Sequence, residues 1–103
     1  MSRYGIICLE GELQGNEIIL EPNEKVVIGR DAKVANLVFR DMTISRIHCA
    51  IEVQGNGLYS ITNYSMNGTQ LENGLKLLPG TSVTASSGSI LMIGKSGTKL
   101  QLE

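Results

Sequence analysis

The chain has 103 residues, of which 42% are hydrophobic and 18% are charged, and its formal net charge is −1. This composition is typical of one globular domain and excludes a disordered or membrane-embedded chain. The near-neutral charge also argues against nucleic-acid or membrane-surface binding, because such proteins usually carry a clear basic excess.

Short β-strands separated by turns are predicted along the whole chain. Alternating or continuous apolar residues mark the segments 4–10, 17–20, 25–28, 36–39, 49–54, 58–63, 69–71, 82–85, 89–93 and 98–103. Turn signals rich in glycine, asparagine and proline separate nearly all of them, and no window of helical periodicity occurs. The pattern predicts an all-β sandwich or barrel in one domain, residues 1–103, which could be a piece of a longer protein.

The two cysteines, Cys8 and Cys49, lie in apolar runs and are predicted to be buried free thiols. They form no CxxC pair, and one histidine with scattered acidic residues makes no recognisable ligand set. We therefore expect neither a metal nor a cofactor. The N-terminal segment has no apolar run typical of a signal peptide, and no stretch approaches a membrane span, so we expect a cytoplasmic location.

A nucleophilic enzyme is one hypothesis, since His48 could act as a base for Ser45 or Cys49. The segment leads directly into a β pattern, however, where Cys49 and His48 would point to opposite faces. The chain also lacks a GxSxG nucleophile motif. We therefore expect no enzymatic activity, and a small hydrolase is the least favoured reading.

Three predicted turns carry residues suited to binding a phosphorylated side chain. Arg30 follows a strand that ends at Gly29, Ser45 and Arg46 precede another strand, and Asn67 belongs to an Asn-Gly turn. Arginine offers phosphate a charged fork of donors, and a serine hydroxyl adds another donor. An asparagine amide can pair with a peptide backbone. Each motif alone is also typical of a solvated turn, and composition cannot show that the turns meet.

In order and spacing, the segments Gly29-Arg30, Ser45-Arg46-Ile47-His48 and Ser65-Met66-Asn67-Gly68 resemble the forkhead-associated (FHA) domain family. Its pattern is Gly-Arg, then Ser-x-x-His, then Ser-x-Asn-Gly, and the resemblance covers roughly residues 4–102. It implies an FHA-like (SMAD/FHA) β-sandwich of about eleven strands in two sheets, with ligand loops at one end. It also implies a non-catalytic, monomeric interaction module of Ser/Thr-kinase signalling that binds a phosphothreonine-containing protein or peptide.

The resemblance assigns roles to eight residues. Those expected to bind the phosphopeptide are Arg30, Ser45, Arg46 and Asn67. Those expected to support the site are Gly29, His48, Ser65 and Gly68. Arg30, Ser45 and Arg46 would serve the phosphate, directly or through the loop that contacts it, and Asn67 would pair with the peptide backbone.

Some positions depart from the family pattern. Many relatives carry serine, threonine or another residue where Met66 stands, and if that position normally offers a hydroxyl to the phosphate, this contact is missing here. Asn63 replaces a frequent aspartate, and the turn at QLENG is one residue longer than usual. These departures keep open a second hypothesis, a scaffold that docks an unphosphorylated partner or oligomerises.

Overall fold

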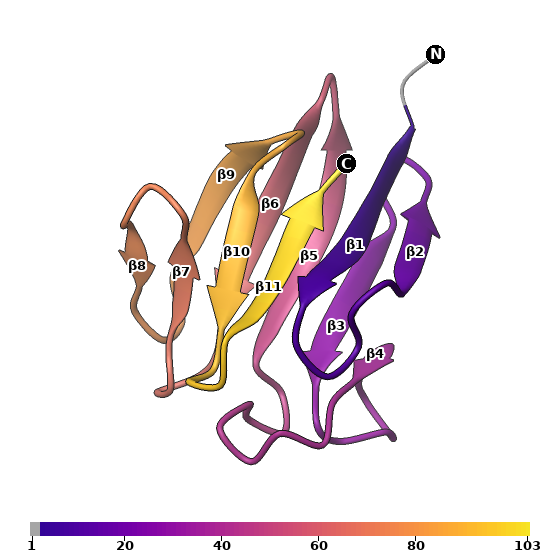
Figure 1. Ribbon diagram of the computed structural model, residues 1–103. Coiled ribbons are helices and arrows are strands. Elements are labelled where there is room, and N and C mark those ends of the chain that lie inside the picture. Colours follow the sequence, from indigo (N-terminus) through magenta and orange to yellow (C-terminus); the bar gives the residue numbers. More distant parts are fainter. Residues whose placement is uncertain (1–2) are drawn as a thin grey trace.

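The computed structural model describes residues 3–103 and contains, within this range, eleven β-strands and no helix. Residues 1 and 2 of the predicted domain lie outside the described residues. The strands form two sheets that face each other, as Figure 1 shows. The predicted all-β sandwich is confirmed, and the barrel alternative is wrong.

The first sheet has six strands in the order β2–β1–β11–β10–β7–β8, all antiparallel to their neighbours. Their bounds are Tyr4–Glu10 for β1, Glu17–Leu20 for β2, Thr69–Leu71 for β7, Lys76–Leu77 for β8, Ile90–Ile93 for β10 and Thr98–Leu102 for β11. Strand β8 was not predicted from the sequence. Its two residues are too few to show alternation, and its pairing with β7 defines it.

The second sheet has five strands in the order β4–β3–β5–β6–β9. Their bounds are Lys25–Gly29 for β3, Leu37–Val38 for β4, Cys49–Gly55 for β5, Leu58–Asn63 for β6 and Ser82–Ser86 for β9. All pairs are antiparallel except β3–β4, which is parallel. The strand predicted over residues 36–39 is shorter in the structure, where β4 comprises only Leu37–Val38.

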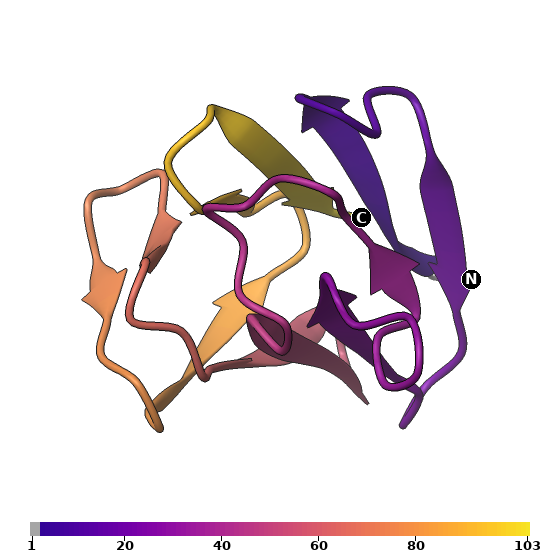
Figure 2. The ribbon, with the colours of Figure 1, turned by 90° about the horizontal axis from the view of Figure 1, so that it is seen from below.

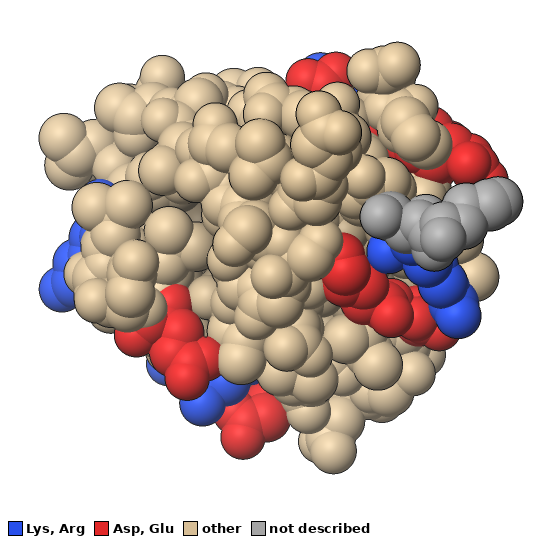
Figure 3. All heavy atoms as spheres, turned by 90° about the horizontal axis from the view of Figure 1, so that it is seen from above, with Lys and Arg blue, Asp and Glu red and all other residues tan. Residues whose placement is uncertain are grey.

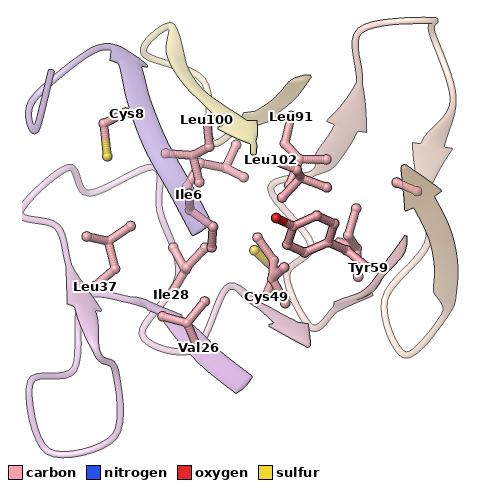
Figure 4. Packing of buried hydrophobic residues seen from close by; sticks show 14 of the residues in the cluster. Ile6, Cys8, Val26, Ile28, Leu37, Cys49, Tyr59, Leu91, Leu100 and Leu102 are labelled. Atoms are coloured by element: carbon pink, nitrogen blue, oxygen red, sulfur yellow. The ribbon is translucent and has the colours of Figure 1, made fainter. Parts of the chain in front are cut away.

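Aliphatic side chains from both sheets fill the core, as Figure 4 shows. Ile28, Leu91 and Leu100 are fully buried. Burying a side chain of this size contributes about 1.5–3 kcal/mol of folding free energy. Cys8 and Cys49 are buried and free in the same core, as the sequence predicted.

The loops between β3 and β4, β4 and β5, β6 and β7, and β10 and β11 all lie at one end of the sandwich, at the bottom of Figure 1. Figure 2 looks onto this end, where the β4–β5 loop crosses the centre of the view. The opposite end carries both termini of the described chain, and uncharged residues cover most of it (Figure 3). The sandwich therefore brings segments that are distant in the sequence together at one end.

Candidate functional site

Gly29, the last residue of β3, lies directly against the β4–β5 loop. A Cβ at position 29 would stand 2.0 Å from the carbonyl oxygen of Arg46. The backbone N–H groups of Arg30 and Asp31 donate to the carbonyl oxygens of Ser45 and Arg46, both at 3.1 Å. Any side chain at position 29 would clash with this carbonyl group, so glycine is required, and its missing side chain lets residues 45–46 lie on the end of β3.

Arg30 is half-buried beneath the same loop. Its Nε donates to the carbonyl oxygen of Ile44 at 2.6 Å, which fixes the direction of the guanidinium group. Among residues 3–103, neither terminal nitrogen of Arg30 has a hydrogen-bond or salt-bridge partner. Arg30 therefore supports the β4–β5 loop with one donor and keeps the outer part of its fork for another acceptor.

His48 is fully buried and joins three segments of the site. Its Nδ1 accepts the backbone N–H of Ser45 at 3.0 Å, so its Nε2 carries the hydrogen and donates to the carbonyl oxygen of Gly68 at 2.7 Å. Its backbone N–H donates to Ile28, and its carbonyl oxygen accepts from Tyr64. The β4–β5 and β6–β7 loops are thus held at a fixed distance by one neutral imidazole.

The lowered pKa of His48 makes the free energy of unfolding depend on pH. Burial lowers the pKa of His48 below its ordinary value of 6.5, against the opposing effects of the Gly68 hydrogen bond and the Asp41 charge. As the pH falls below about 6.5, the unfolded chain therefore takes up the proton before the folded one does. The free energy of unfolding is expected to decrease until the pH passes the folded pKa, by ~1.4 kcal/mol per unit of pKa difference.

Urea denaturation at several pH values between 7.5 and 5 would measure this loss. His48 is the only histidine of the chain, so a His48→Asn variant should lack the same pH dependence even if it is less stable. Stability that stays constant or rises as the pH falls from 7 to 5.5 would contradict the neutral, hydrogen-bonded histidine.

Asn63, at the end of β6, organises the β6–β7 loop from inside the protein. Its Nδ2 donates to the carbonyl oxygens of Ser65 and Leu77, at 3.0 and 2.9 Å. Its Oδ1 accepts the backbone N–H of Ser65 at 3.1 Å and the hydroxyl of Thr69 at 2.8 Å. An aspartate could not donate the first two bonds, so asparagine fits this buried position well.

Ser45 and Ser65 join the two loops through their hydroxyl groups. Their Oγ atoms are 2.6 Å apart, and either one can be the donor. Ser65 is buried, and its Oγ also accepts the backbone N–H of Asn67 at 2.9 Å. Ser45 is half-buried. The half-buried Ser45 hydroxyl is thus hydrogen-bonded to the buried Ser65 hydroxyl.

The remaining residues of the predicted site lie on the surface of the same loops. The Arg46 side chain is exposed, and Asn67 is half-buried. Met66, between Ser65 and Asn67, is 87% exposed and has no hydroxyl to offer. The eight predicted residues therefore lie together at one end of the sandwich, Gly29 at the end of β3 and the others in the adjoining loops.

Residues that the sequence analysis did not select also hold the β4–β5 loop. The Glu12 carboxylate, from the β1–β2 loop, accepts the backbone N–H groups of Arg40 and Asp41 at 2.7–3.0 Å. The Thr43 hydroxyl donates to the Asp41 carboxylate at 2.8 Å and accepts the backbone N–H of Lys95 at 2.9 Å. The contacts made by Glu12 and Lys95 join residues far apart in the chain, so no local pattern could reveal them.

The geometry gives no support to a nucleophilic enzyme. Both ring nitrogens of His48 are engaged by backbone groups, and the Ser45 hydroxyl is bonded to Ser65 instead. Burial raises the pKa of Cys49 to about 12, so its thiol stays protonated at neutral pH. Residues 3–103 hold no group of three or more side chains able to bind a metal ion, and no helix able to span a membrane.

Comparisons with known proteins agree with this geometry. The sequence model of the FHA domain matches residues 26–94, more than half of the chain. No curated protein sequence matches it significantly. The crystal structure of the FHA domain of the CT664 protein from Chlamydia trachomatis superposes with a TM-score of 0.85 at 29% identity, covering 98% of this chain and 96% of that one.

Two further solved structures have the same fold. The FHA domain of an Arabidopsis thaliana hypothetical protein has a TM-score of 0.84 at 26% identity, covering 98% of this chain and 84% of that one. The N-terminal FHA domain of Rad53p from S. cerevisiae, solved with a phosphothreonine peptide, has a TM-score of 0.77 at 20% identity. That match covers 98% of this chain and 92% of the yeast domain.

Proposed function

Because the chain belongs to the FHA domain family, we propose that it is a non-catalytic module that binds a phosphothreonine-containing protein or peptide in Ser/Thr-kinase signalling. The ligand binds at the end of the sandwich where the β3–β4, β4–β5 and β6–β7 loops meet. The observation that carries this proposal is the position of Arg30. Its Nε donates to the carbonyl oxygen of Ile44, the residue before Ser45, and the two terminal nitrogens of its guanidinium group are left to bind a phosphate. The yeast relative bound to a phosphothreonine peptide supports the same ligand class.

The Ser45 hydroxyl is prepared to donate to the phosphate. The Ser65 oxygen already accepts the Asn67 N–H, so the Ser65 proton is free to point to the Ser45 oxygen. The Ser45 proton then points outward, where an anion can accept it. Consecutive hydrogen bonds of this kind polarise one another, which strengthens the Ser45 hydroxyl as a donor.

Arg46 and Asn67 complete the proposed site from its rim. The exposed Arg46 adds a positive charge that attracts a phosphate carrying about −1.5 to −2 charges at neutral pH. The amide of Asn67 can donate to and accept from a peptide backbone, which fixes the direction of the bound segment. The support for these two roles is their position beside Ser45 and Ser65.

The expected affinity is in the micromolar range. Hydrogen bonds to a charged group contribute about 1.5–3 kcal/mol each. Three or four of them contribute up to about 12 kcal/mol, and after an association cost of about 4 kcal/mol this is consistent with a dissociation constant near 1 μM, about −8 kcal/mol. The net charge of −1 makes a nucleic acid or an anionic membrane a poor alternative ligand. The proposed protein is a monomer. Its proposed location is the cytoplasm, a compartment where free thiols such as Cys8 and Cys49 persist.

One observation favours the second candidate, docking or oligomerisation that is independent of phosphorylation. Met66, between Ser65 and Asn67, exposes 87% of its surface, and Tyr64, two residues earlier in the same loop, is 48% exposed. Exposed apolar side chains at a loop cluster are typical of protein contacts. A partner held by such contacts would not need a phosphate.

A phosphothreonine peptide library, with its phosphatase-treated duplicate, separates the two candidates. We expect some phosphorylated peptides to bind in fluorescence anisotropy with micromolar dissociation constants, and their dephosphorylated forms to lose binding. Equal binding before and after phosphatase treatment would overturn the phosphothreonine proposal and favour the docking surface.

A Met66→Thr variant is expected to bind a phosphothreonine peptide that carries only serine at its flanking positions about 3- to 10-fold more tightly, because it adds one hydroxyl donor beside the phosphate. The matched control is Met42→Thr, which makes the same change at an exposed methionine of the β4–β5 loop that belongs to none of the three motifs. Unchanged affinity in Met66→Thr would contradict a phosphate position within reach of residue 66.

A further inference from the structure

A groove of about 240 Å³ opens beside the proposed phosphopeptide site, on the outer face of the first sheet. It begins at Asn67 and Gly68 in the β6–β7 loop, so it is continuous with the proposed site. Its other walls come from strands β7, β8 and β10 and include Gln70, Lys76 and Met92, and Met66 of the β6–β7 loop also lines it. Pockets for small molecules usually measure about 300–1,000 Å³, so this space fits one side chain better than a free metabolite.

The strand register explains why these side chains face outward together. Met92 pairs with Gln70, and Gln70 pairs with Lys76, so the three stand in one row across β10, β7 and β8. Their neighbours Leu91 and Ile93 point into the core and are at most 1% exposed. Because successive side chains of a strand alternate between faces, the row lies on the outer surface.

The groove is apolar at Met66 and Met92 and positive at Lys76, which lies on the edge strand β8. Met66 and Met92 supply flexible, polarisable walls that adapt to apolar side chains. Lys76 takes part in neither of the two salt bridges that occur within residues 3–103. By contrast, Lys99, which pairs with Met92 in the same row, is bound to Glu10 at 3.3 Å. Lys76 is therefore the positively charged side chain of this row that can pair with an acidic group of a ligand.

We propose that this groove binds the stretch of the same phosphopeptide that flanks the phosphothreonine. An apolar side chain lies between Met66 and Met92, and an acidic side chain farther along the peptide meets Lys76. The assignment rests on the proposed function and on the continuity of the groove with Asn67. Gln70 follows Asn67 by three residues, which span at most about 10 Å, so the apolar and acidic positions fall within about four residues of the phosphothreonine.

The test uses phosphothreonine peptides that differ only in the flanking residues, measured by fluorescence anisotropy. Leucine, serine and lysine are placed in turn at each of the four positions on either side. Glutamate, glutamine and lysine are then compared at the positions beyond the best leucine. We expect one position to favour leucine over lysine by about 5- to 10-fold, and a more distant one to favour glutamate over lysine by about 2- to 5-fold.

Two variants connect these preferences to the groove. Lys76→Glu should reverse the preference for glutamate over lysine, and Met92→Thr should reduce the preference for leucine. Lys25→Glu, which makes the same charge change on β3 of the other sheet, should leave both preferences as in the wild type.

The possible results separate the two proposals. If phosphorylated peptides bind but neither preference exists, or if both persist in Lys76→Glu and Met92→Thr, the groove assignment is overturned while the proposed function stands. If no phosphothreonine peptide binds the wild-type domain, the proposed function fails, and the groove assignment fails with it.

Discussion

Replacing Arg30 by alanine is expected to weaken the binding of phosphothreonine peptides by about 100-fold, because the variant loses a charged fork able to form two hydrogen bonds with a phosphate. The same change removes the Nε bond to the Ile44 carbonyl, which costs about 1 kcal/mol of folding free energy. The fold should survive, since the core does not depend on this side chain. Isothermal titration calorimetry would measure the affinity, and thermal unfolding would measure the stability.

Arg40→Ala is the matched control for this experiment. It removes an arginine at the same end of the sandwich, and the contact of this residue with Glu12 uses its backbone N–H and not its side chain. Arg30→Lys keeps the charge and loses the fork, so it should retain only part of the affinity. Wild-type affinity in a folded Arg30→Ala protein would show that the phosphate does not lie at Arg30.

Replacing Gly29 by alanine is expected to have the largest effect on stability. The added Cβ would lie 2.0 Å from the Arg46 carbonyl oxygen and 2.7 Å from its carbonyl carbon, both backbone atoms that cannot move away alone. Overpacking in a rigid place costs about 1–3 kcal/mol and occasionally more, and we expect the upper end of this range. The β4–β5 loop should move off β3, so peptide affinity should fall as well.

Gly97→Ala is a suitable comparison for the Gly29 variant. Gly97 has a φ of +85° with nothing within 4 Å of an added Cβ, so this variant reports backbone strain without a clash. That strain costs about 1–2 kcal/mol. Urea denaturation of both variants would measure the difference. A loss of less than about 1 kcal/mol in Gly29→Ala would contradict the close approach of the loop to β3.

Much of the fold could be predicted because each strand buries one face. The alternation in residues 58–63, for example, places Tyr59, Ile61 and Asn63 inside, and all three are buried in the structure. Strand β8 could not be found in this way, since two residues carry no period. The shortening of the fourth strand to Leu37–Val38 likewise depends on its parallel partner β3 and not on its own residues.

The candidate site could be predicted as a set of motifs, but not as a network. The order of Gly-Arg, Ser-x-x-His and Ser-x-Asn-Gly identified the loops that the sandwich brings together. The partners of His48 and Asn63 depend on where Gly68 and Leu77 lie in space. The contact of Glu12 with the β4–β5 loop spans 28 residues and leaves no trace in the local sequence. Asn63 was noted only as a departure from the family, whereas its four hydrogen bonds make it a support of the β6–β7 loop.

The most direct test of the central claim is an NMR titration of the isotope-labelled domain with a phosphothreonine peptide and with its unphosphorylated counterpart. We predict that only the phosphorylated peptide shifts the backbone amide signals, and that the largest shifts occur at Arg30, Ser45, Arg46 and Asn67. Equal shifts with both peptides, or shifts confined to the edge strands and the opposite end of the sandwich, would contradict a phosphate-binding site in these loops.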